Sequence, residues 1–168
     1  MLYHNVDHTR DVYEATKNIA AAEGVTDHDL ELLLMAAAYH DTGFCHTYQG
    51  HEEEGVRLFK THFPQVPLGD LQVIEELILA TKVSHIPQNQ LEEIIRDADL
   101  DYLGREDFPV ISENLYDELR GLNKISSKKA WHKVQLNFLK NHHYYTAYSR
   151  THRAPGKAKN LESILLTP

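Results

Sequence analysis

The sequence has little of what builds disulfide frameworks, membrane spans or hairpins. Cys45 is its only cysteine, which excludes an intrachain disulfide and is typical of a protein from the reducing cytoplasm. No apolar run approaches the ~20 residues that a membrane-spanning helix needs. The chain also contains no Asn-Gly or Asp-Gly pair and no convincing alternation of apolar and polar residues. These absences predict a cytoplasmic, helical protein without a membrane anchor.

Acidic residues are missing from one long segment. Residues 119–161 contain ten Lys and Arg but no Asp or Glu, whereas residues 1–118 contain seven Lys and Arg against twenty-four Asp and Glu. The basic C-terminal arm, about residues 119–166, either meets an anionic substrate over an acidic cleft or neutralises the acidic body by packing on it. The formal net charge of −8 argues against bulk nucleic-acid binding.

Apolar residues recur with helical spacing along most of the chain. Thr26 is the expected N-cap of the second helix, with Asp29 in the capping-box position, and Ser126 or Ser127 is expected to begin a late helix. Residues 154–157 are expected to form a turn and residues 161–166 a last apolar piece. The expected helices span about residues 5–22, 26–41, 51–63, 70–82, 88–104, 109–119 and 126–148. We predict an all-α fold, a single-domain irregular helical bundle over residues 1–168.

Several imidazole and carboxylate groups are expected to face the interior. His40 and Asp41 end an apolar helix rich in small residues, and burying such a pair is costly unless something binds both groups. His4 and His8 are four residues apart and therefore share a helix face. Asp99 lies on the inward stripe of its helix. Three helices that each offer a hard ligand at an inward position predict a site for a divalent cation.

The order of these residues resembles a known family signature. His8, the His40–Asp41 pair and Asp99 follow the H…HD…D pattern of the HD-domain superfamily of metal-dependent phosphohydrolases. Residues 3–8, Tyr-His-Asn-Val-Asp-His, resemble the YHNxxH opening of many members. Residues 95–104 resemble the family's D-A-D-x-L-D helix, and His51-Glu52-x-x-Gly55 resembles a further element. The motif region covers about residues 3–105.

The resemblance implies a ligand set and a reaction. His8, His40, Asp41 and Asp99 would bind one divalent cation, and Mn, Fe, Mg, Zn and Ni all suit such nitrogen and oxygen donors. The substrate would be a small-molecule phosphomonoester or phosphodiester, with a nucleotide as one candidate. Asp41 is expected to be needed for catalysis as a ligand. His4 is a candidate general acid by analogy with phosphodiesterases in the family, or else an N-terminal histidine without a catalytic role.

Other residues are candidates for a second metal or for the substrate phosphate. Members with two metals have further histidines, which His51 and His85 would supply here. Thr81 stands where one of these histidines is expected, which favours one tightly held metal. Lys82 and Arg105 are candidate phosphate ligands. Phe44 occupies a position where several subfamilies have Lys, which argues against the cyclic-dinucleotide subgroup.

Two other functions are compatible with the same fold. Some HD-fold proteins are di-iron oxygenases, which require six protein ligands, and Thr81 argues against that set. A non-catalytic module that binds a nucleotide or a partner is the other alternative. The presence of all four expected ligands favours an enzyme over such a module.

Overall fold

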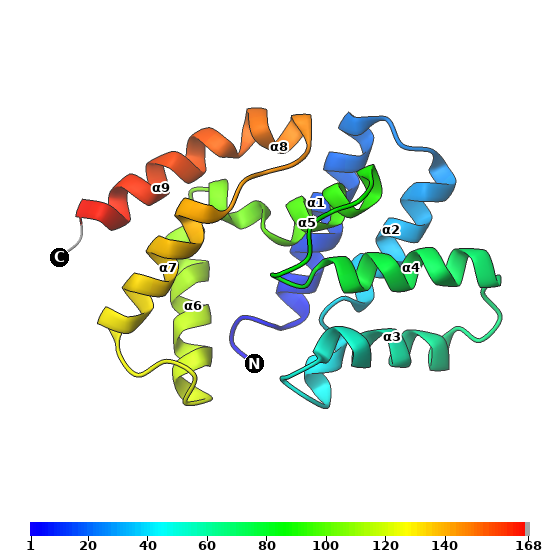
Figure 1. The fold of residues 1–168 in the computed structure, drawn as a ribbon, viewed down its shortest axis with the longest axis horizontal. Coiled ribbons are helices and arrows are strands. Elements are labelled where there is room, and N and C mark those ends of the chain that lie inside the picture. Colours follow the sequence, from blue (N-terminus) through cyan, green and yellow to red (C-terminus); the bar gives the residue numbers. More distant parts are fainter. Residues whose placement is uncertain (167–168) are drawn as a thin grey trace. The chain divides into compact units, whose positions relative to one another are not determined.

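The computed structural model describes residues 1–166 and is all-α in this part of the chain, as predicted. Its elements are α1 (Val6–Glu23), α2 (Asp27–Tyr39), η1 (Thr42–Cys45), α3 (His51–His62), α4 (Leu68–Ala80), α5 (Gln90–Asp99), η2 (Asp101–Gly104), α6 (Phe108–Gly121), α7 (Lys128–Asn141), α8 (Ala147–His152) and α9 (Ala154–Leu166) (Figure 1). None of the described helices combines the length and apolarity that crossing a membrane requires.

The described chain divides into two compact units. One contains residues 6–100, and the other contains residues 1–5 and 101–166; we call them the 6–100 unit and the 101–166 unit. The prediction of one domain over residues 1–168 stays a prediction, and each unit is described by itself.

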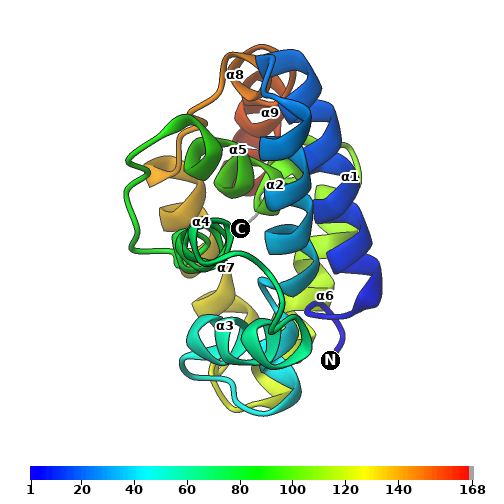
Figure 2. The same cartoon turned by 90° about the vertical axis from the view of Figure 1, so that its right-hand side faces the viewer.

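The 6–100 unit is built on helices that pack through apolar side chains. α1 packs against α2 and α5, while α4 contacts α2, α3 and α5 (Figures 1 and 2). Residues from four of these helices are fully buried at the centre: Ile19, Leu33, Ile74, Ile78, Ile94 and Ile95. As predicted, Thr26 caps α2, because its side chain accepts a hydrogen bond from the backbone N–H of Asp29.

A buried arginine ties α5 to the end of α4. Arg96 is 8% exposed, and its guanidinium donates hydrogen bonds to the carbonyl oxygens of Ala80 at 2.9 Å and Val83 at 3.4 Å. It also donates to the carbonyl of Lys82. Ala80 is the last residue of α4, where helical carbonyls lack intrahelical partners, and Lys82 and Val83 belong to the turn that follows it. Arg96 therefore fixes the path of the chain as it leaves α4.

The 101–166 unit contains η2 and the helices from α6 to α9. Asp101, which is buried, accepts hydrogen bonds from Arg153 at 2.7 Å and from Arg105 at 3.5 Å. Lys128 pairs with Glu113. Within this unit, part of the basic arm therefore serves as structural partner to acidic side chains.

Most expected helix boundaries agree with the structure to within two residues, but three elements differ more from the sequence-based expectation. The helix expected over 88–104 is α5 followed by the 3-10 helix η2, and the late helix ends at Asn141, with α8 separate from it. Ser127, one of the two expected caps, begins that late helix. Residues 154–157 form the first turn of α9 rather than an isolated turn. Proline is tolerated there because the first helical N–H groups need no intrahelical acceptor.

Replacing Arg96 tests its structural role. We expect Arg96→Leu to lower the free energy of unfolding by about 3 kcal/mol, because three carbonyl groups lose a charged donor. Arg10→Leu is the matched control: the Arg10 side chain is 76% exposed and only pairs with Asp7 at 3.5 Å, so the change should stay within about 0.5 kcal/mol. Urea unfolding measures both. Equal losses in the two variants would contradict the assignment.

Candidate metal centre

The His40–Asp41 pair stands where α2 gives way to the 3-10 helix η1. The backbone N–H of His40 still donates to the carbonyl of Ala36 at 2.8 Å, and Asp41, with φ −107° and ψ 0°, is the N-cap of η1. The Thr42 hydroxyl donates to the carbonyl of Tyr39 at 2.8 Å. Because the chain changes direction here, the side chains of His40 and Asp41 lie side by side, with His40 Nε2 3.2 Å from Asp41 Oδ2.

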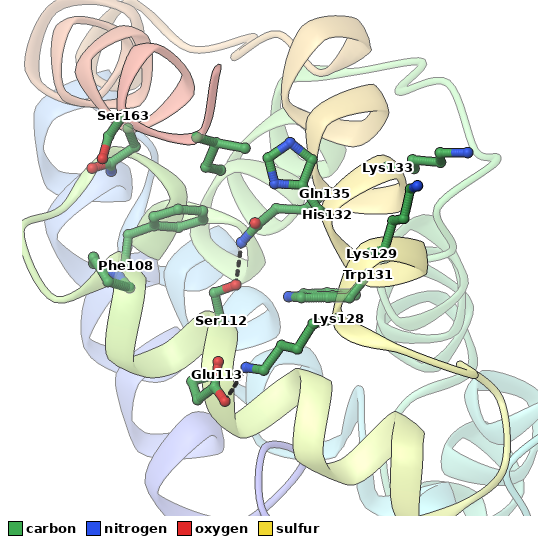
Figure 3. A pocket seen from close by; sticks show the side chains of 13 residues that line it. Phe108, Ser112, Glu113, Lys128, Lys129, Trp131, His132, Lys133, Gln135 and Ser163 are labelled. Carbon is green, nitrogen blue, oxygen red and sulfur yellow. Dashed lines mark hydrogen bonds and ion pairs between the residues drawn. The ribbon is translucent and has the colours of Figure 1, made fainter. Parts of the chain in front are cut away.

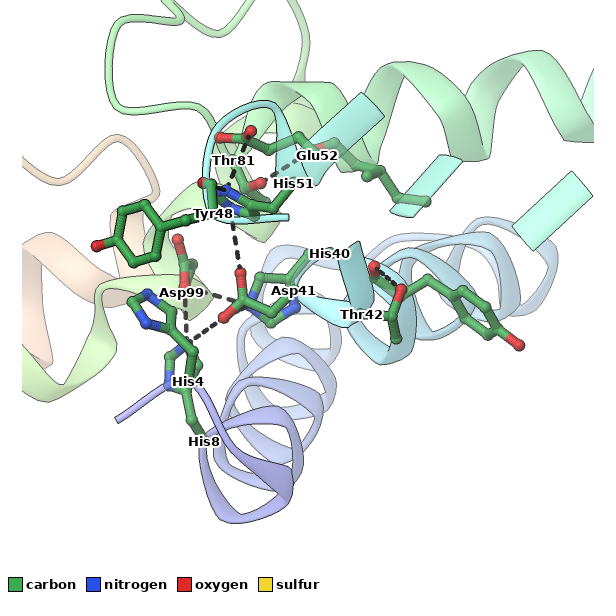
Figure 4. Close-up of polar contacts among 12 residues, drawn as sticks. His4, His8, His40, Asp41, Thr42, Tyr48, His51, Glu52, Thr81 and Asp99 are labelled. Atoms are coloured by element: carbon green, nitrogen blue, oxygen red, sulfur yellow. Dashed lines mark hydrogen bonds and ion pairs between the residues drawn. The ribbon is translucent and has the colours of Figure 1, made fainter. Parts of the chain in front are cut away.

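His8 of α1 and Asp99 of α5 meet the pair there (Figure 4). His8 Nε2 lies 3.3 Å from Asp41 Oδ2 and 3.3 Å from Asp99 Oδ1. His40 Nε2 lies 3.2 Å from Asp41 Oδ2 and 3.5 Å from Asp99 Oδ1. Two nitrogens and two oxygens therefore alternate around a ring. The His8, His40 and Asp41 donor atoms lie within 4.8 Å of one another.

The ring contains buried polar atoms that lack a hydrogen-bond partner. His40 Nδ1 lies 2.8 Å from the carbonyl of Ala37, which can only accept, so Nδ1 carries a proton. In a neutral imidazole, Nε2 then presents its lone pair to the two carboxylates. His40 Nε2 and Asp41 Oδ2 are both buried without a hydrogen-bond partner. A lone pair facing two carboxylate oxygens is repulsive unless a cation lies between them.

The spacing of the donor atoms fits a divalent cation. Donors at about 2.1 Å from one ion are separated by about 3.0 Å at right angles and about 3.4 Å in a tetrahedron. The ring edges of 3.2–3.5 Å are close to these values. A ligating histidine commonly donates its other ring N–H to a backbone carbonyl, as His40 does to Ala37. The residues present therefore suit a metal ion.

The charges of the four groups are strongly linked. Burial alone would lower the pKa of His8 and His40, but Asp41 and Asp99 outweigh it and raise both pKa values, that of His40 well above its usual range. Burial alone would raise the pKa of Asp41 and Asp99, yet the two imidazoles hold both well below their usual range. Without a metal, protons on the imidazoles supply the positive charge that the carboxylates require.

His51, at the start of α3, lies beside this ring. Its Nε2 is 3.5 Å from Asp41 Oδ1, and its ring stacks on Phe44 with centroids 3.7 Å apart. Two glycines permit the close packing: a Cβ on Gly43 would lie 1.9 Å from the carbonyl oxygen of His51, and one on Gly55 would lie 2.7 Å from that of Tyr39. Phe44 thus orients His51 by stacking.

Two further candidates in the 6–100 unit, Lys82 and His85, have structural partners, as does Thr81, which stands where a metal-binding histidine is expected. Lys82 pairs with Glu53 at 2.5 Å, and His85 Nε2 contacts Glu92 at 2.7 Å. The Thr81 hydroxyl donates to the carbonyl of Ile78 at 2.8 Å. The sequence analysis did not identify Glu92, which is buried. Its position three residues after Asn89, the N-cap of α5 whose side chain accepts the backbone N–H of Glu92, is a local signal that could have pointed to it. The roles of Lys82 and His85 in metal or phosphate binding stay predictions.

Two candidates lie in the 101–166 unit. His4 Nδ1 contacts Glu118, whose carboxylate also accepts the backbone N–H groups of Tyr3 at 2.8 Å and His4 at 3.1 Å. Burial would raise the pKa of Glu118, but these interactions lower it. Arg105 donates to Asp107 at 2.8 and 2.9 Å. Glu118 was missed from the sequence because nothing local links it to His4, 114 residues away.

Comparison with known proteins agrees with the arrangement of the motifs. The family model described as HD domain matches residues 5–101, more than half of the chain. This range contains His8, the His40–Asp41 pair, His51 and Asp99, and the match confirms the resemblance drawn from the sequence. No curated protein and no solved structure matches the chain significantly.

The raised histidine pKa values predict pH-dependent metal binding. Because the pKa values of His8 and His40 are raised, a metal must compete with protons for the two imidazoles, so lowering the pH should weaken metal binding. We expect the apparent Kd for Mn²⁺ to rise about tenfold or more from pH 8 to pH 6, with at least one proton released per ion. Calorimetric titration in buffers of different ionisation enthalpy measures both. An affinity independent of pH, without proton release, would contradict this account.

Proposed function

The chain belongs to the HD domain family, and from this premise and the geometry of the ring we propose that it is a metal-dependent phosphohydrolase. His8, His40, Asp41 and Asp99 are the proposed ligands of one divalent cation. The observation that carries the proposal is a pair of buried atoms without a hydrogen-bond partner, His40 Nε2 and Asp41 Oδ2, which face each other across 3.2 Å.

The donor set indicates the kind of ion and the chemistry. Imidazole and carboxylate donors suit Mn²⁺, Fe²⁺, Mg²⁺, Zn²⁺ or Ni²⁺. When bound, such an ion polarises a phosphoryl group and lowers the pKa of a bound water. Four protein ligands leave positions for water and a phosphate oxygen on a six-coordinate ion. The substrate class that fits is a phosphomonoester or phosphodiester, of which a nucleotide is a candidate.

His51 is the proposed contact for the substrate phosphate or for a second, weaker ion. Its Nε2 faces the Asp41 oxygen that lies away from the ring, at 3.5 Å. The stack on Phe44 and the 3.3 Å contact between Nδ1 and the carbonyl of Tyr48 hold the imidazole in this direction. A fixed imidazole orients a phosphate oxygen without losing side-chain entropy on binding.

His4 is the proposed general acid, which donates a proton to the leaving oxygen. A general acid must begin the reaction protonated. The contact of Nδ1 with Glu118 favours that state, because the Glu118 carboxylate is ionised at neutral pH and stabilises an imidazolium. The backbone N–H groups of Tyr3 and His4 fix the same carboxylate, so its position is set independently of the ring.

Replacing Asp41 tests the ligand assignment. We expect Asp41→Ala to weaken Mn²⁺ binding by more than about 100-fold and to reduce phosphate release from a panel of phosphate esters to background. Asp7→Ala is the matched control, because the Asp7 side chain is 89% exposed on the same helix as His8. Metal content by elemental analysis and phosphate release measure the two effects. Wild-type protein that releases no phosphate with any divalent metal would refute the proposal, as would two tightly bound irons.

Replacing His4 separates proton donation from metal binding. We expect His4→Ala to retain the metal while lowering kcat by about 100-fold or more, the usual contribution of a general acid. His28→Ala, an exposed histidine that pairs with Asp70 at 3.1 Å, should change neither quantity. Loss of metal from His4→Ala would show that His4 is a ligand instead of an acid.

A further inference from the structure

A pocket separate from the ring lies within the 101–166 unit. It has a volume of about 700 Å³ and is lined by residues of α6, α7 and α9 (Figure 3). This volume is within the usual range for small-molecule sites, about 300–1,000 Å³. None of the proposed metal ligands lines it. An inference about this pocket is therefore independent of the phosphohydrolase activity.

Aromatic and aliphatic side chains form the walls of the pocket. Phe108, Trp131 and Ile164 line it from α6, α7 and α9, and they are only 4%, 8% and 9% exposed. The Phe108 ring stacks on Tyr102 with centroids 6.1 Å apart, and the Trp131 ring lies 6.3 Å from that of Tyr116. Because packing holds these rings, they offer apolar surfaces to a flat ligand at little entropic cost.

The lysines near the pocket do not favour an anion inside it. Lys128 lines the pocket but pairs with Glu113, so these two charges cancel. Figure 3 shows Lys129 and Lys133 extending on the side of α7 away from the cavity. A charged ligand would therefore lose its hydration without gaining an unpaired lysine as counter-charge within the pocket.

Two uncharged hydrogen-bond donors of buried residues lie at the pocket. Gln135 donates to the Ser112 hydroxyl oxygen, which leaves the Ser112 O–H itself to donate. Ser112 is 4% exposed and Trp131 8%, and within the described residues neither the Ser112 O–H nor the Trp131 indole N–H has an acceptor. Figure 3 shows the indole nitrogen at the end of the ring that points toward α6. A buried donor is costly unless a group accepts its hydrogen bond.

We propose that this pocket binds an uncharged, flat heteroaromatic compound with hydrogen-bond acceptors on its edge, a chemistry that nucleobases share. The ring system packs against Phe108 and Ile164, and carbonyl oxygens or ring nitrogens accept from Trp131 and Ser112. A hydrocarbon ligand would leave both donors unpaired, and an ion would be desolvated without compensation. The apolar walls and the two neutral donors together select this class.

Caffeine is a suitable probe because it is flat, uncharged and carries acceptors but no donors. Trp131 is the only tryptophan in the chain, so its indole N–H gives one cross-peak in a nitrogen–proton correlation spectrum of the full-length protein. We expect caffeine to move this peak saturably, with the proton shifted downfield by the new hydrogen bond. The absence of a saturable shift at millimolar caffeine would overturn the proposal.

Ser112→Ala and Trp131→Phe each remove one donor and keep the walls apolar. Each should raise the Kd for caffeine, measured by calorimetry, about fivefold, which corresponds to one neutral hydrogen bond. Ser126→Ala is the matched control, because Ser126 is exposed and does not line the pocket, so the Kd should stay within about twofold. Equal effects of Ser112→Ala and Ser126→Ala would count against the proposal.

Two analogues of the probe test the ligand class. Theophylline-7-acetate replaces one methyl group of caffeine with a carboxymethyl group and should bind no more tightly than caffeine. Tighter binding, through His132 or the lysines, would overturn the uncharged class. Toluene lacks acceptors and should bind at least about fivefold more weakly, and equal affinity for toluene and caffeine would also overturn the proposal. EDTA is present throughout, so none of these outcomes depends on a metal or on phosphate release.

Discussion

The structure of the 6–100 unit depends on one electrostatic constraint. Two imidazole nitrogens and two carboxylate oxygens meet at a largely buried point, and each contact between them is attractive only if a proton or a metal ion lies there. A proton satisfies this requirement on His8 or His40, and a divalent ion satisfies it at all four positions together. Groups that would be costly to bury alone therefore become mutually compatible.

The surrounding helices hold this arrangement through backbone contacts. Small residues let elements approach closely: Ala36 and Ala37 are fully buried in α2, and Gly43 and Gly55 leave no room for a Cβ between η1, α2 and α3. Arg96, in the last turn of α5, uses its guanidinium to fix the carbonyls at the end of α4 and in the turn that follows it. The donors are thus positioned by rigid elements instead of mobile loops.

The acidic residues of the 6–100 unit and the basic residues of the C-terminal arm contact different kinds of side chain. In the 6–100 unit, carboxylates face imidazoles at the ring. In the 101–166 unit, Arg153 and Lys128 partner the acidic side chains of Asp101 and Glu113. The two structural pairs account for only part of the basic segment.

The sequence by itself determined the helical class and the Thr26 cap, because periodicity and capping are local properties. The residues that converge on the ring were indicated by the order of motifs that resembles the HD-domain family. The contacts of Glu118 with His4 and of Arg96 with the carbonyls at and after the end of α4 could not be predicted, since each depends on how segments apart in the sequence pack. The turn expected at 154–157 became helical for a similar reason: Gly156 lies against the backbone of Gly104, where a Cβ would be 2.0 Å from its carbonyl oxygen. Local patterns specify which groups are available, and only tertiary packing decides which of them meet.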